Sequence, residues 1–333
     1  MIQAPFVLCF GGFGEKHMVL PHRNRGEMAM FYRIEERLTV LPEESVPERG
    51  QYVAVLTPSE WARRQGSFDM GIDIEADLEA AMDMQAEVNY DSVTGVIRVP
   101  DRSDLSEDGV WFSFALDEKG IVFIDGTGTA ERMVSALAAK RWRKPGIERL
   151  LYDFLMLLVE GDTAFMKRVE EELDRMERGI YADEKDAASP ERVNEIRNDM
   201  RDLDDYLEHL QDFASVLEEN ENGFFEEENL RYFRLFYNRV EKLRDKAASL
   251  REQAMQMRDL YKMHLDIRQN RIMTVLTVVT AIFAPLTLIV GWYGMNFVYM
   301  PELALPYAYP ALICVFVVLI VALVVFFRKI RWL

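Results

Sequence analysis

The sequence Tyr293-Gly294-Met295-Asn296-Phe297 lies in a short gap between the two most apolar segments of this 333-residue chain. These segments, 272–293 and 308–327, contain no charged side chain. At a rise of about 1.5 Å per residue, each can cross a hydrocarbon core about 30 Å thick. The sequence therefore predicts two transmembrane helices, joined by a loop, 294–307, that carries a hydrogen-bonding tripeptide.

Basic residues flank the two segments on one side only. The loop between them has none, and the flanking ones are Arg258, Lys262, Arg268 and Arg271 before the first segment and Arg328, Lys329 and Arg331 after the second. By the positive-inside rule, we expect a two-pass protein of the plasma (inner) membrane, with both termini in the cytoplasm and the loop outside. The N-terminus has no basic region ahead of its short apolar run, so we expect no secretory signal.

The chain carries a formal charge of −17. Nucleic acid requires a basic surface, so we do not expect it as a partner, whereas membrane lipid and cations remain as partners. An acidic surface also serves simply to keep a large cytosolic region soluble. Cys9 would lie in the reducing cytosol and Cys314 inside the second segment, so no disulfide is expected.

Residues 1–128 are predicted to form a cytosolic α/β domain. The expected strands are Phe6–Phe10, Tyr52–Leu56 and Gly95–Val99, together with a hairpin of Val110–Leu116 and Ile121–Ile124 around a four-residue loop that ends on glycine, and Asp73–Ala86 has helical spacing. Acidic helices follow over 129–223. Their expected ranges are Ala130–Arg143, Ile147–Tyr181 and a helix from Ser189-Pro190 to about Glu219.

From Phe224 to Ala284 the chain has neither glycine nor proline. One helix is therefore predicted to run from a cytosolic stalk, 224–271, into the first membrane segment without interruption. Such a long helix must bury its apolar side against neighbours, which favours a bundle with other copies of the chain. The expected tail after the second segment is 328–333. The fold class is thus an α+β cytosolic domain with a long helical stalk and two C-terminal transmembrane helices.

Two helices cannot enclose a conduction path, so transport would require several copies. The first segment carries a stripe of mostly small or polar residues at alternating steps of three and four: Asn270, Met273, Thr277, Thr280, Ala284, Thr287 and Gly291. Such residues face a bundle interior or water rather than lipid, although close helix packing alone would explain them equally well. The second segment is almost purely apolar and suits an outer, lipid-facing position, which favours pore lining by the first.

No acid or base lies inside either segment, which disfavours a carboxylate cage for bare ions. At the loop, Asn296 offers an amide carbonyl, and glycine at Gly294 permits a sharp turn that exposes backbone carbonyls. A ring of neutral oxygens suits a cation that keeps its water, as Mg²⁺ does. Pro285 removes one hydrogen bond from the first segment and allows a kink there.

The loop Gly294-Met295-Asn296, followed by Met300-Pro301-Glu302-Leu303, resembles the CorA family of magnesium channels. That family is marked by a Gly-Met-Asn loop between two C-terminal spans. The resemblance covers about the last fifth of the chain. It extends through Asn270, Met273, Leu276, Thr277, Phe283, Pro285, Leu286, Thr287 and Gly291 to the basic tail. Upstream, only the general plan is similar.

The resemblance implies a funnel-shaped homopentamer for Mg²⁺ influx, without a cofactor. It also implies an outer site for hydrated Mg²⁺ at Asn296 and Gly294, and it assigns to the pore lining Asn270, Met273, Leu276, Thr280, Thr287 and Gly291. Glu302 would form an acidic ring at the entrance or be a solvated loop residue.

Two positions depart from the family pattern. Ala284 replaces a bulkier methionine of family members, so a hydrophobic gate would rest on Met273 and Leu276. Leu235 follows Tyr232-Phe233-Arg234 where family members can carry an aspartate that binds regulatory Mg²⁺ between subunits. Asp259 and Asp266, nearer the membrane, are either alternative ion sites or solvated stalk carboxylates.

Three alternatives follow from the sequence. A relative that moves Zn²⁺, Co²⁺ or Ni²⁺ would share the plan, although related zinc transporters depart from this loop sequence. A membrane-anchored scaffold or sensor would have two spans but no reason for a small, polar stripe. An enzyme is not expected, because the four histidines form no catalytic or zinc motif: His17, His22, His209 and His264.

Overall fold

The structure is a computed structural model that describes residues 29–41, 46–47, 49–68, 70, 84–105, 108–183, 189–296, 300–301 and 305–330. The chain divides into two compact units. The first contains Met1–Pro100, Gly109–Leu158 and Asp212–Tyr237, and the second contains Asp101–Asp108, Val159–Gln211 and Asn238–Leu333. The predicted limits of the cytosolic and membrane parts stay predictions.

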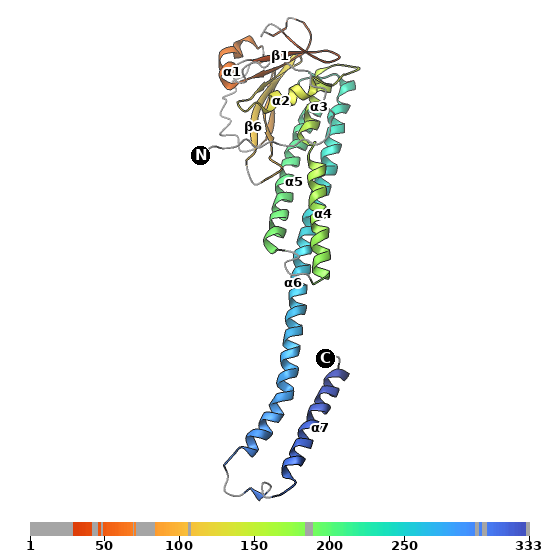
Figure 1. Cartoon of the computed structure of the whole chain (residues 1–333). Coiled ribbons are helices and arrows are strands. Elements are labelled where there is room, and N and C mark those ends of the chain that lie inside the picture. The colour runs from red at the N-terminus through yellow and green to blue at the C-terminus, as the bar shows by residue number, and fades with distance from the viewer. Residues whose placement is uncertain are drawn as a thin grey trace. The chain divides into compact units, whose positions relative to one another are not determined.

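The first unit is built on a mixed sheet of seven strands in the order β2-β1-β3-β7-β6-β5-β4 (Figure 1). The strands are β1 Met30–Ile34, β2 Leu38–Val40, β3 Tyr52–Leu56, β4 Gln85–Val88, β5 Val93–Val99, β6 Val110–Leu116 and β7 Gly120–Ile124. Only β3 and β7 pair in parallel, and every residue of both is buried. Strands buried on both faces form continuous apolar runs, which is why Tyr52–Leu56 could be predicted from sequence.

The predicted hairpin of β6 and β7 is confirmed, with a loop one residue shorter than expected. Leu116 pairs with Ile121, and β7 already begins at Gly120. Asp117 closes the loop, because its Oδ1 accepts hydrogen bonds from the backbone N–H groups of Lys119 and Gly120 at 2.8 and 2.7 Å. A side chain at position 120 would lie only 2.6 Å from the ring of Tyr52, so glycine is required there.

Three helices complete the described part of this unit: α1 Pro58–Arg64, α2 Thr129–Leu137 and α3 Ile147–Leu158. The prediction that the helix after Gly128 reaches Arg143 is wrong, because the chain leaves the helix after Leu137 to place Trp142. The indole N–H of Trp142 donates to the buried Asp153 at 2.7 Å, and its backbone N–H donates to the carbonyl of Glu36, also at 2.7 Å. These contacts join residues far apart in sequence.

The predicted helix Asp73–Ala86 is wrong at its end. Gln85 and Ala86 belong to β4, which pairs antiparallel with β5 so that Gln85 lies opposite Val96. Residues 73–83 of that prediction, and the predicted strand Phe6–Phe10, lie outside the described residues.

Three long helices follow in the chain: α4 Asp162–Tyr181 belongs to the second unit, whereas α5 from Pro190 to Glu219 and α6 from Arg231 to Tyr293 each have residues in both units (Figure 1). The predicted start of α5 is confirmed, since the Ser189 hydroxyl accepts from the backbone N–H of Arg192. The helices are joined by ion pairs of Arg192 with Glu172 at 2.7 Å and of Arg244 with Asp204 at 3.2 Å. The membrane segment α7 spans Ala308–Lys329.

Two predicted helix limits need correction. The single helix expected over Ile147–Tyr181 is interrupted between Leu158 and Asp162, where Gly161, a poor helix former, precedes α4. Helix α6 begins at Arg231 rather than near Phe224, because the backbone N–H of Glu226 and the side chain of Asn229 donate to the buried Glu148 at 3.0 and 3.3 Å. Those contacts hold Glu227–Asn229 in a separate 3-10 turn.

An ion pair between Arg102 and Asp162 stabilises the second unit. The Asp162 side chain is fully buried, and Arg102 Nε donates to its Oδ1 at 2.8 Å. Burial raises the pKa of the Asp162 carboxyl, although Arg102 opposes the shift. Because this pKa is higher in the folded than in the unfolded chain, the carboxyl favours folding at low pH, and that contribution is lost as the pH rises through the folded pKa.

We expect Arg102→Met to lower the free energy of unfolding by about 3 kcal/mol at neutral pH, because it leaves a buried carboxylate without its cation. The loss should shrink at acidic pH, because the raised pKa of Asp162 favours its neutral, protonated form there. Urea unfolding of the purified chain in detergent, followed by circular dichroism, measures both effects. Arg178→Met, at an exposed arginine of α4, is the control and should change little. Equal losses at both pH values would contradict the assignment.

Candidate pore and ion-binding loop

Two described helices, α6 and α7, contain a stretch that is long and apolar enough to cross a membrane. Only 6% of the most apolar stretch of each helix is buried within the chain. Water does not tolerate so large an apolar surface. Lipid or other copies of the chain must therefore cover most of it.

The predicted stripe lies on a single face of α6, and all seven of its residues are exposed. Leu276, also assigned to the pore, is 58% exposed, and Met273 is 54% exposed. Steps of three and four residues keep the stripe on one side of the helix. No other part of the described chain therefore covers this side.

A different face of α6 is the one that the chain itself covers. Val278 is buried, with 4% exposed, and Thr274, Ala281, Pro285 and Ile289 are half-buried. These five positions also recur at steps of three and four, but they are offset by about a third of a turn from the stripe. Helix α6 thus leaves the stripe uncovered by the rest of the described chain.

Threonine hydroxyls of the stripe are bonded to the helix backbone. Those of Thr277, Thr280 and Thr287 donate to the carbonyls four residues earlier, at 2.8, 2.8 and 2.9 Å. Each hydroxyl has one hydrogen, so its remaining capacity is to accept hydrogen bonds. The stripe therefore offers acceptors, which match the outward-pointing hydrogens of water bound to a cation.

The loop begins immediately after α6. The backbone N–H of Gly294 donates to the carbonyl of Val290 at 2.9 Å, and that of Met295 donates to Trp292 at 3.3 Å. Gly294 lies in a turn but is not among the glycines with positive φ, so this turn does not depend on the left-handed conformation that glycine permits. The reason for glycine is close approach instead, since a side chain would lie 3.1 Å from the Val290 carbonyl oxygen. Asn296 is exposed, and Glu302 lies outside the described residues.

The two stalk carboxylates proposed from sequence are also exposed. Asp259 is 70% exposed and lies 3.7 Å from Arg258, and Asp266 has no ion pair with any described residue. Both share one side of α6 with the stripe, because Asp266 is seven residues, or about two turns, before Met273. The same seven-residue spacing extends upstream to two further acids, Glu252 and Asp245. Neither was predicted as an ion site, although the spacing is visible in the sequence.

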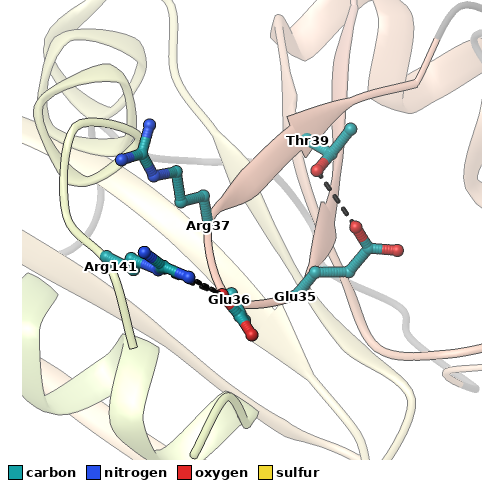
Figure 2. Close-up of a pocket in the computed structure, with 5 residues that line it drawn as sticks. All are labelled: Glu35, Glu36, Arg37, Thr39 and Arg141. Atoms are coloured by element: carbon teal, nitrogen blue, oxygen red, sulfur yellow. Dashed lines mark hydrogen bonds and ion pairs between the residues drawn. The ribbon is translucent and has the colours of Figure 1, made fainter. Parts of the chain in front are cut away.

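No group of three or more His, Cys, Asp or Glu side chains in the described part of one chain could hold a metal ion. Figure 2 shows the open hollow of about 470 Å³ near the turn after β1. Both of its carboxylates have partners, since Arg141 pairs with Glu36 at 2.6 Å and Thr39 donates to Glu35 at 3.2 Å.

Comparison with known proteins decides the family. Residues 53–329 match the model of a family described as CorA-like Mg²⁺ transporter protein. The chain belongs to this family. The CorA resemblance of the loop is thus confirmed, and membership places the chain among transporters rather than enzymes.

A CorA relative, the cobalt/magnesium transport protein CorA of Thermotoga maritima, is 30% identical over 191 residues. That match covers 57% of this chain and 54% of the relative, so the chain spans about half the length of this relative. The structure of the CorA magnesium transporter of Methanocaldococcus jannaschii has a TM-score of 0.74 at 22% identity, covering 92% of this chain and 99% of the other. The full-length CmaX protein has a TM-score of 0.70 at 17% identity, with 93% and 100% covered.

These structures confirm the predicted fold class, a mixed α/β part followed by a long helix and two C-terminal apolar helices. The ion-site and pore residues stay predictions: Gly294, Asn296, Glu302, Asp259 and Asp266 for ions, and the stripe with Leu276 for the pore.

Proposed function

We propose that this chain is a subunit of a homopentameric channel through which Mg²⁺ enters the cytoplasm. The observation that carries the proposal is the division of α6 into two faces. The chain covers one face itself and leaves the small, polar stripe uncovered. Membership of the CorA-like transporter family supports a stripe that lines a path between copies.

The proposed orientation places both termini in the cytoplasm and the loop outside. It rests on the basic residues that flank the spans and on the absence of basic residues from the loop between them. Membrane potential, negative inside, then drives cations inward by about 2.3 kcal/mol per charge for each 100 mV. A divalent ion gains twice that energy, so influx needs no coupled reaction.

At the outer entrance, we assign ion selection to Asn296 and to backbone carbonyls near Gly294. Neutral oxygens cannot repay the dehydration of Mg²⁺, but they can accept hydrogen bonds from its bound water. Glu302 would add an acidic ring that concentrates cations. The hydrated ion then passes threonine oxygens that are available as acceptors.

A hydrophobic gate is assigned to Met273 and Leu276, the bulkiest residues that accompany the stripe. Below them, Asp266 and Asp259 continue along the same side of α6 and would attract ions toward the cytoplasm. Leu235 is 53% exposed and offers no ligand oxygen. We therefore propose that Mg²⁺ does not close the channel by binding at this position.

The second candidate is transport of another divalent cation by the same path. One observation favours Co²⁺ in particular, since the similar protein of Thermotoga maritima is named a cobalt/magnesium transport protein. Selection through bound water discriminates weakly between hydrated ions of equal charge. Both ions would then share the path.

The test is ion flux into vesicles that contain the purified full chain. We expect Mg²⁺ influx that rises when the interior is made negative and falls when external Co²⁺ competes, with weaker competition by Zn²⁺. Vesicles without protein provide the control. Zn²⁺ flux without Mg²⁺ flux would replace the proposed ion, and the absence of any divalent flux from correctly assembled protein would overturn the channel.

A further inference from the structure

Four basic residues lie at the cytosolic ends of the two membrane helices. Arg268 and Arg271 precede the first span, by about 6 Å and 1.5 Å of helix rise, and Arg328 and Lys329 directly follow the second. All four are exposed, and none has a hydrogen bond or ion pair with any described residue. Their charges are therefore not neutralised within the described chain.

Several cations of the helical unit farther from the membrane have acidic partners. Arg192 pairs with Glu172 and Glu195, Arg244 with Asp204 and Glu208, and Lys246 with Glu170. The chain has a large excess of acid, 56 acidic against 39 basic residues, so partners are abundant. The overall charge therefore does not explain why four cations without acidic partners gather at the membrane boundary.

The two arginines of α6 also point away from the stripe. Arg271 is seven residues before the buried Val278 and therefore lies on the opposite face, and Arg268 is one turn before it. The nearest acid of the helix, Asp266, is instead aligned with Met273 on the stripe side. If the stripe faces the other copies, these arginines face outward, toward the headgroups of the surrounding lipid.

We propose that Arg268, Arg271, Arg328 and Lys329 form a binding surface for the phosphates of anionic phospholipids in the cytoplasmic leaflet. Guanidinium groups suit phosphate because their planar set of donors can bind two oxygens at once. Basic residues immediately cytoplasmic of a membrane helix are attracted to anionic lipid. Bound lipid would hold the ends of α6 and α7 at the level of the headgroups.

The experiment titrates the detergent-solubilised full chain with phosphatidylglycerol or with phosphatidylcholine and measures the thermal midpoint. We expect phosphatidylglycerol to raise the midpoint by several degrees more than phosphatidylcholine does, and added salt to reduce the difference. A variant with all four residues changed to Gln should lose the difference. A charge-preserving variant, with the arginines changed to Lys and Lys329→Arg, should retain most of it.

Lys242→Gln is the matched control, because Lys242 is exposed and unpaired among the described residues but lies about 45 Å before the first span. It should respond like the parent chain. An equal response to both lipids, or an unchanged response of the Gln variant, would overturn the proposal. Dissociation of the Gln variant to the same extent in both lipids would also overturn it, by assigning the cations to contacts between copies.

The proposal depends on the proposed membrane orientation but not on conduction. Lipid binding without Mg²⁺ flux would therefore overturn the proposed function alone. Flux without a preference for phosphatidylglycerol would overturn only the lipid site.

Discussion

Asn296→Ala is expected to reduce Mg²⁺ influx by about tenfold or more, because a hydrogen bond to bound water, worth about 1 kcal/mol, is lost in every copy. The side chain is exposed, so its removal should leave the thermal midpoint unchanged. The measurement is the initial rate of Mg²⁺ entry into vesicles that contain equal amounts of each variant.

The matched control for this change is Asn238→Ala. Asn238 is another exposed amide of α6, far upstream of the membrane segment. It should conduct like the parent chain. If Asn296→Ala retains full influx while assembling normally, the loop does not select the ion, and the outer site must be sought elsewhere.

Gly291→Leu is expected to reduce Mg²⁺ influx by at least about tenfold, because it adds bulk where the stripes of neighbouring copies would converge. A Cβ atom added at Gly291 meets no described atom within 4 Å outside the neighbouring backbone of its own helix. We therefore expect the loss of flux to come from contacts between copies rather than from a clash within the single chain. The same vesicle assay measures the effect, and the size of the assembly in detergent shows whether copies still associate.

The control for steric bulk is Val290→Phe. Val290 is the preceding residue, 57% exposed and outside the stripe, so added bulk should face lipid and leave influx nearly unchanged. Gly291→Ala provides a graded variant that should retain part of the influx. If Gly291→Leu conducts as the parent chain does, the stripe does not line the path, and helix packing alone would account for its small residues.

Some elements could be predicted because their signals are local. The cap at Ser189-Pro190 located the start of α5, and an unbroken apolar run located β3. The ends of helices α2 and α3 could not be predicted in this way. They depend on distant residues, as when Asp153 binds Trp142 and Arg102 pairs with the first residue of α4.

The strand β4 shows the same limitation. Gln85 and Ala86 fitted a helical spacing, but the backbone of this segment is satisfied by pairing with β5. Sequence spacing describes one segment at a time, whereas strand pairing depends on a second segment. The start of α6 likewise depended on Glu148, which is 78 residues away from Glu226.

For the candidate site, the spacing of the stripe was visible in the sequence, but its exposure was not. Packing of the chain buries the side chain of Val278 and leaves that of Thr280 exposed, although the two are only two residues apart. The acids Asp245 and Glu252 were missed because charged residues are common along a stalk. Only their alignment with Asp259 and the stripe distinguishes them.

Hydrophobicity was sufficient to predict the two apolar helices and the loop between them, because it is a property of each short segment, whereas the orientation inferred from flanking charge stays a prediction. Only the tertiary structure determines which face of α6 stays exposed and available to other copies. The reason is that burial depends on residues distant in sequence. The ends of helices and the pairing of strands depend on distant residues in the same way.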